Sequence, residues 1–117
     1  MTKHYIGTKI VLAWPEVKDE KEGYAVKYAD GYTSWSPKDV FEAAYVDIGH
    51  VGHLESWQQR VVGEKAELDA KLVKLDAALE NDENKLYMAD SQRALLNRQS
   101  DAMRAYSAIL AERIAAF

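Results

Sequence analysis

The sequence contains no cysteine, which excludes a disulfide framework and any zinc site with cysteine ligands. The absence is also typical of proteins from a reducing compartment. No apolar run approaches the roughly 18 residues of a membrane-spanning helix, and the opening MTKHYIGTK lacks the apolar segment of a signal peptide. We therefore expect a cytoplasmic protein of 117 residues that forms one domain, or a small domain with an appendage.

Sequence motifs of enzyme active sites are absent as well. There is no P-loop, no Rossmann glycine pattern and no G-x-S-x-G, and the acids recur three or four residues from lysines, as in EKAELDAKLVKLD. His50 and His53 form H-x-x-H, but Gly49 and Gly52 place the pair in a linker. We expect a binding protein rather than an enzyme, with no catalytic residue, no metal site and no cofactor.

Positive charge is scarce and unevenly placed. The net charge of −4 argues against a nucleic-acid partner, because such partners select basic surfaces. Four of the five arginines nevertheless follow residue 90, in a stretch without lysine: Arg93, Arg98, Arg104 and Arg113. They are either solvent-exposed charges on a helix or a row of donors for the phosphates of a compact ligand.

The first 45 residues have the pattern of β-strands. TKIVLAW (8–14) is a β-rich run that Pro15 closes, and the charged PEVKDEKEG that follows is expected to form a loop. YAVKYA alternates in character and precedes Asp30-Gly31, which predicts a two-residue type I′ turn before the return strand YTSWS. The segment therefore predicts a small antiparallel sheet.

A short helix is expected directly after the return strand. Ser36 is a candidate N-cap and Pro37 suits the first helical position, so the helix should run to Tyr45. Eight of the twelve aromatic residues precede residue 46. Those expected in the core are Trp14, Tyr24, Tyr28 and Phe41.

Tyr32 and Trp35 flank the predicted turn, and Lys38 lies at the expected helix start. These residues have two interpretations. They are either ordinary hairpin packing beside a capped helix, or a platform on which a nucleotide base stacks while its phosphate meets the helix N-terminus.

The second half of the chain predicts a long antiparallel helical hairpin. DIGHVGH (47–53) forms a boundary between a sheet module at 1–48 and a hairpin at 54–117, and ENDENK (80–85) is a polar break between the helices. The seam of the first helix comprises Trp57, Val61, Leu68, Leu72, Leu75 and Leu79, and that of the second Leu96, Met103, Tyr106, Leu110 and Phe117. Additional apolar residues at Leu95 and Ile109 widen the second stripe, which predicts a homo-oligomer.

VVGEKAELDAKLVKLDAAL (61–79) and LLNRQSDAMRAYSAILAERIAAF (95–117) resemble the helical hairpin shared by two groups of phage anti-defence sponges. These groups are the first type of Thoeris anti-defence protein and the CBASS sponge of tailed phages. GYAVKYADGYTSWSPKDVFEAAY (23–45) is similar to the β-part of the Thoeris type. Ser100 departs from the pattern, because it stands where a leucine is expected on the seam.

The resemblance implies a non-enzymatic sponge in the host cytoplasm. It would bind cyclic nucleotide signals, namely glycocyclic ADP-ribose or cyclic di- or trinucleotides, at pockets where the protomers of a dimer or hexamer meet. From chemistry we infer these ligand-binding residues: Tyr32, Trp35, Lys38, Asn97, Arg98, Arg104, Tyr106 and Arg113. The alternative is a structural protein, an oligomeric helical hairpin that docks a protein partner.

Overall fold

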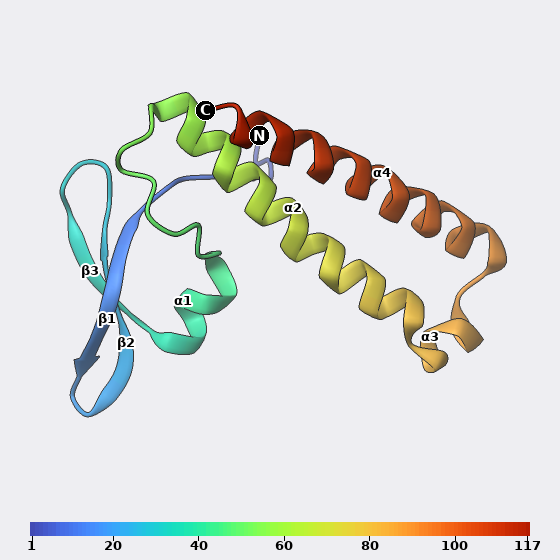
Figure 1. The fold of residues 1–117 in the computed structure, drawn as a ribbon. Helices are drawn as coiled ribbons and strands as arrows, with labels where there is room; N and C mark the ends of the chain where they lie inside the picture. Colours follow the sequence, from blue (N-terminus) through green and yellow to red (C-terminus); the bar gives the residue numbers. More distant parts are fainter. The chain divides into compact units, whose positions relative to one another are not determined.

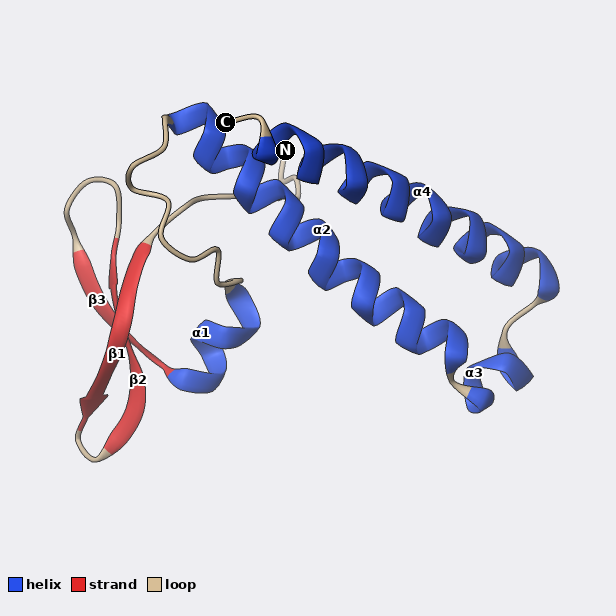
Figure 2. Cartoon of the chain, viewed as in Figure 1, coloured by secondary structure: helices blue, strands red, loops and turns tan.

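The computed structural model describes residues 1–117 and divides into two compact units, Met1–Tyr45 and Val46–Phe117 (Figure 1). The first unit contains a three-stranded antiparallel sheet and a short helix, and the second contains the long helices (Figure 2). The predicted α+β class, with a small sheet followed by a helical hairpin, is confirmed.

The sheet has the order β1-β2-β3, formed by β1 (Leu12–Lys18), β2 (Lys21–Lys27) and β3 (Thr33–Pro37). The prediction that Pro15 closes the first strand is wrong, because β1 continues through it to residue 18. Proline is tolerated there since β1 is an edge strand, whose outer side needs no hydrogen-bond donor.

The predicted charged loop is instead the tight turn between β1 and β2. Lys18 pairs with Lys21, so only Asp19 and Glu20 form the connection. Their φ angles of 50° and 64° are both positive, as a type I′ turn requires. This turn is not predictable from the sequence pattern, because neither residue is a glycine or an asparagine.

The turn between β2 and β3 is a hairpin turn, as predicted, but it is not of the predicted type. The amide of Gly31 donates to the carbonyl of Tyr28 at 2.9 Å, and Tyr28 also pairs with Tyr32, so three residues form the loop. Only Gly31, with φ of 90°, is left-handed, while Asp30 is not. This is the geometry of a type I turn followed by a bulge, in which glycine occupies the left-handed position.

Helix α1 (Lys38–Ala44) begins two residues after the predicted cap. Ser36 lies in β3, where it pairs with Tyr24, and no side chain caps the helix. Pro37 occupies the N-cap position with ψ of 147°, because β3 extends through it before the chain turns into the helix. The prediction that Ser36 caps this helix is therefore wrong.

The aromatic rings that hold α1 on the sheet form a continuous stack. Phe41 stacks on Tyr24 at 4.4 Å between centroids and on Tyr45 at 4.8 Å, and the hydroxyl of Tyr24 donates to Glu42 at 2.7 Å. Trp14 is 44% exposed, so its predicted core position is wrong. It lies on an edge strand, and the buried residues belong to the central strand β2.

The helical unit consists of α2 (Ser56–Glu80), α3 (Asp82–Tyr87) and α4 (Asp90–Ala115). Glu55 and Gln58 form a capping box that starts α2. The predicted polar break overlaps the short helix α3, in which the amides of Glu83 and Asn84 donate to the side chain of Asn81. None of the helices combines the length and the apolar character needed to cross a membrane.

Candidate functional site

Polar side-chain hydrogen bonds join the two long helices in addition to their apolar contacts. The only buried apolar residues of the hairpin are Val61, Leu79 and Leu110, and Ser100 is also buried, at 4% exposure. The hydroxyl of Ser100 donates to Asp76 at 2.7 Å, which pairs the α4 serine with an α2 carboxylate. The residue that departs from the expected leucine pattern is therefore a specific interhelical contact.

The same arrangement recurs seven residues away on each helix. The hydroxyl of Ser107 donates to Asp69 at 2.6 Å, and Lys65 donates to the other oxygen of Asp69 at 2.6 Å. We call the four paired residues of the two steps (Asp69, Asp76, Ser100 and Ser107) the polar ladder. The carboxylates of Asp69 and Asp76 on α2 reach across to α4. The acids of EKAELDAKLVKLD therefore do more than pair with neighbouring lysines on the surface of α2.

Arg104 completes the step at Asp76. Its guanidinium donates to Asp76 at 2.8 Å and to the Ser100 hydroxyl at 3.0 Å. The pKa of Asp76 is lowered first by the hydrogen bond from Ser100 and then by that from Arg104. The pKa of Asp69 is lowered chiefly by Lys65 and also by Ser107.

These shifts predict a pH dependence of stability. A carboxylate whose folded pKa lies below its unfolded value stabilises the fold above about pH 4, and this contribution is lost as the pH falls through the folded pKa. Denaturant unfolding between pH 2 and pH 6 should therefore show a loss of stability in acid that is smaller in Asp76→Asn. Ser100→Ala, which removes the main donor, should also flatten the curve. A variant curve parallel to that of the wild type would contradict the assignment.

The predicted hairpin residues fall on different sides of α4. Tyr106 and Arg113 are seven residues apart, about two turns, and so share one flank, as do Asn97 and Arg104 on another. The hydrogen bond to Glu64 raises the pKa of the Tyr106 hydroxyl, and the positive charge of Arg113 opposes this shift. The structure thus separates Arg104 from Arg113 on a single chain, and Arg98 points between the two flanks.

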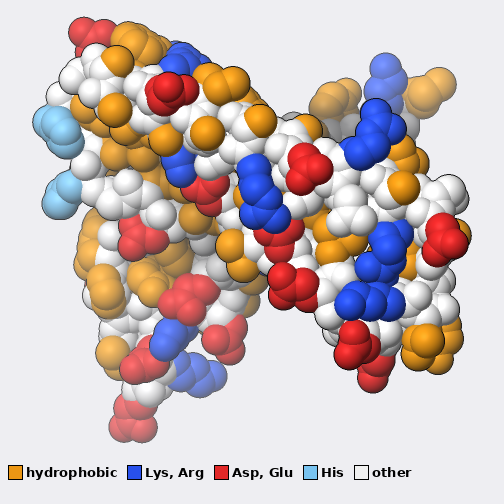
Figure 3. All heavy atoms as spheres, turned by 45° about the vertical axis from the view of Figure 1, so that its right-hand side comes forward, with side chains coloured by type: hydrophobic (Ala, Val, Ile, Leu, Met, Phe, Trp, Pro, Cys, Tyr) orange, Lys and Arg blue, Asp and Glu red, His pale blue; other side chains and the backbone are white.

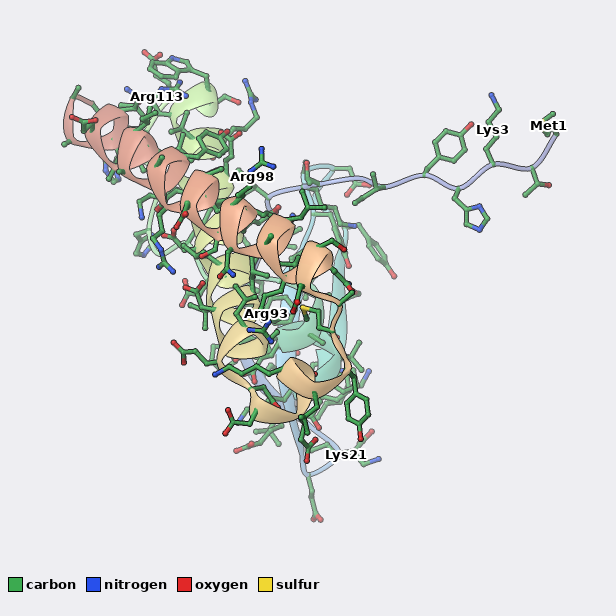
Figure 4. The ribbon with its side chains drawn as sticks, turned by 90° about the vertical axis from the view of Figure 1, so that its right-hand side faces the viewer. Met1, Lys3, Lys21, Arg93, Arg98 and Arg113 are labelled. Atoms are coloured by element: carbon green, nitrogen blue, oxygen red, sulfur yellow. The ribbon has the colours of Figure 1, made fainter.

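The arginines of α4 differ in how they are engaged. Arg104 is paired with Asp76, and Arg93 donates to the carbonyl of Leu79 at 3.3 Å while its second nitrogen is buried without a partner. Arg98 and Arg113 form no side-chain hydrogen bond or ion pair, and they lie at separate levels of the helix (Figure 4). These two guanidinium groups are therefore available to an anion.

Aromatic side chains lie on the same side of the hairpin as Arg113. The sequence pattern predicted them only as residues of the seam between the two helices. Trp57 contacts Phe117 edge to face at 5.3 Å, and their exposures are 45% and 38%. The hydroxyl of Tyr106 donates to Glu64, and this bond raises the pKa of Tyr106. The apolar spacing places these rings on the hairpin, but it does not reveal that they remain half exposed.

The three predicted residues of the sheet unit do not form one site. Tyr32 stacks loosely on Tyr28 at 6.1 Å, and the indole of Trp35 donates to the carbonyl of Glu16 at 2.9 Å. Lys38 instead meets Glu22 at 3.7 Å. A shallow depression of about 320 Å³ beside it is lined in part by Glu16 and Glu22, whose charges disfavour a phosphate.

Charge on the face drawn in Figure 3 is mixed rather than gathered. Basic and acidic side chains are interspersed there, and none of the basic groups forms a broad patch. A ligand on the hairpin would thus be selected by individual side chains such as Arg113 rather than by a broad field of one sign.

Comparison with known proteins identifies one family. No curated protein and no solved structure matches the chain. The model of the family described as Sequestin matches residues 55–116, which include α2, α3 and α4. The family name indicates a sequestering role. Because the match extends over more than half of the sequence, the chain belongs to the Sequestin family.

Proposed function

We propose that the protein is a non-enzymatic phage sponge that sequesters a cyclic nucleotide immune signal. The observation that carries the proposal is the Sequestin match over the whole helical hairpin. The resemblance of the hairpin to Thoeris and CBASS anti-defence proteins supports glycocyclic ADP-ribose or a cyclic di- or trinucleotide as the ligand. Capture without cleavage would lower the free signal in the host cell.

The side chains of α4 suit such a ligand. A cyclic nucleotide presents planar bases and two or more phosphates, which favour aromatic rings and guanidinium forks. Arg98 and Arg113 have no carboxylate partner, and Tyr106 lies about two helical turns from Arg113 on the same flank of α4. We assign Arg113 and Tyr106 to one half of the ligand contact, and Arg104 with Asn97 to the other half, contributed by a second protomer.

A second protomer is also favoured by apolar exposure on α4. Leu95 is 60% exposed and Ile109 is 54% exposed, although both belong to a helix that already packs on α2. Static light scattering at micromolar concentration should therefore give a mass well above the 13.2 kDa of one chain. A monodisperse monomer at that concentration would refute the oligomer.

Alanine variants of the arginines should weaken ligand binding. A charge-assisted hydrogen bond to phosphate contributes about 1.5–3 kcal/mol, so losing one should raise Kd roughly 10- to 150-fold. Calorimetric titration of Arg98→Ala, Arg104→Ala and Arg113→Ala with glycocyclic ADP-ribose and a cyclic trinucleotide measures this. Lys74→Ala, at an exposed position on α2, is the matched control. Wild-type affinity in all three arginine variants would contradict the assignment.

Heat release tests the function itself. The protein is incubated with a panel of cyclic nucleotides, separated from free ligand, denatured by heat, and the supernatant is analysed by chromatography. Intact ligand in the supernatant supports sequestration, whereas a converted product would show an enzyme. Capture of none of the panel would favour the alternative of a structural protein that docks a protein partner, which the exposure of Leu95 and Ile109 also fits.

A further inference from the structure

The sheet of the first unit has one covered and one bare face. Side chains of successive strand residues alternate between faces, and Tyr24, which stacks on Phe41 of α1, marks the covered one. Trp14 and Trp35 both pair with Ala25 and therefore lie on the bare face. Leu12, two residues from Trp14, shares this face and is 66% exposed.

The lysines of the sheet are all on the bare face. Lys18 pairs with Lys21 at one end, and Lys27 pairs with Leu12 at the other, so their side chains lie on the same side as Trp14. Glu22, one residue from Lys21, points to the covered face and meets Lys38 there. Among the paired residues only Glu16 brings a carboxylate to the bare face. Strand alternation thus separates the charges, although the chain as a whole is acidic.

The two indoles on this face have different roles. The ring of Trp35 lies against Gly23, its N–H is bonded to the carbonyl of Glu16, and the ammonium of Lys18 lies 5.9 Å from its centroid. Trp35 is therefore held as part of the sheet. Trp14 is 44% exposed and its N–H has no partner in the chain, so its ring is the open stacking surface.

We propose that the bare face binds single-stranded nucleic acid, with one base stacked on Trp14 and the adjacent phosphates on Lys27 and Lys18. Along the strands, Lys27 lies on one side of Trp14 and Lys18 lies on the other. A base stacked on Trp14 would therefore have a lysine available for the phosphate on each side of it. From Leu12 to Lys18 the strand spans about 20 Å, which suits the shortest known single-strand sites, of about four nucleotides.

The net charge of −4, which predicts no nucleic-acid partner from the sequence, does not oppose this placement. At physiological salt the Debye length is about 8 Å, so acids elsewhere on the molecule are largely screened from this surface. Asp19 and Glu20, in the turn between Lys18 and Lys21, offset the charge at that end, so the net positive charge of this face rests on Lys27, and Lys18 contributes a hydrogen-bond donor.

The test is fluorescence anisotropy with fluorescein-labelled octathymidylate and octauridylate, using the full chain at 25 and 150 mM salt. We expect binding that weakens with salt, with a slope of log K against log salt of about −1.4 for the two lysine contacts. Trp14→Ala should weaken binding about tenfold or more, since stacking on one ring has that magnitude. Lys27→Gln should reduce the slope by about 0.7.

Matched controls lie outside the sheet. Tyr87→Ala removes a ring that is 89% exposed on α3, and Lys74→Gln removes an exposed α2 lysine, so neither should change binding. Circular dichroism confirms that each variant is folded, and Trp14→Phe should restore most of the affinity. Absence of binding at 25 mM salt, or equal losses in the controls, would overturn the proposal. Equal competition by polyglutamate would also overturn it, because it would identify the face as a docking site for acidic protein.

Discussion

Leu110→Asp should unfold the helical hairpin. Leu110 has 0% exposure, and the substitution leaves a buried carboxylate without a partner while it removes the largest fully buried side chain of the hairpin. An uncompensated buried charge costs about 3–5 kcal/mol, which is comparable with the whole stability of a small domain. Far-UV circular dichroism at 25 °C should therefore show a large loss of helix, and thermal unfolding should lose its cooperative transition.

The adjacent residue provides the matched control. Ile109 is 54% exposed, so Ile109→Asp places the same charge one residue away, where water solvates it. This variant should keep the wild-type helix content, and it should shift the protein toward the monomer if the outer face of α4 is the oligomer contact. Equal helix loss in the two variants would show that the burial assigned to Leu110 is wrong.

Gly23→Ala should strongly destabilise the sheet unit. A Cβ at this position would lie 2.4 Å from the backbone oxygen of Ser36 and 2.4 Å from the ring of Trp35. Neither neighbour can move freely, because Ser36 belongs to the paired strand β3 and the Trp35 indole is bonded to Glu16. Overpacking of this kind costs about 1–3 kcal/mol, and the backbone contact places this case at the upper end. Near-UV circular dichroism during urea unfolding follows the change.

Gly63→Ala is the corresponding control in the hairpin. A Cβ there meets no atom within 4 Å, and the position lies inside α2. Alanine in a helix interior is favoured over glycine by up to about 1 kcal/mol, so this variant should be slightly more stable than the wild type. If Gly63→Ala destabilised the protein as much as Gly23→Ala, the descriptions of Gly23 as crowded and of Gly63 as open would both be wrong.

The hairpin was accessible from sequence because its apolar spacing is local information. The alternating steps of three and four residues predict both long helices, and the polar stretch at 80–85 predicts where they separate. The partner of Ser100 was not accessible, because it lies 24 residues away and any of several α2 acids could have met it. The sequence shows that Ser100 is unusual at a seam position. Only the register of the two helices shows that its hydrogen-bond partner is Asp76.

The sheet unit was predicted less well because its signals conflict. Ser36-Pro37 has the composition of a helix start, yet pairing with β2 extends β3 through Pro37. Asp30-Gly31 favours a type I′ turn in isolation, but the pairing of Tyr28 with Tyr32 imposes a longer loop. Propensity therefore located each element, and tertiary hydrogen bonding decided its end.

The polar ladder has a consequence for folding errors. Asp69 meets Ser107 and Asp76 meets Ser100, so the two pairs share one antiparallel alignment. A slip of one heptad would break both pairs and bring one aspartate opposite the other serine, so that a single pair could form, and a slip of any other size would align neither aspartate with either serine. Misaligned hairpins should therefore be short-lived. The polar ladder thus selects the native register of the two helices as the chain collapses.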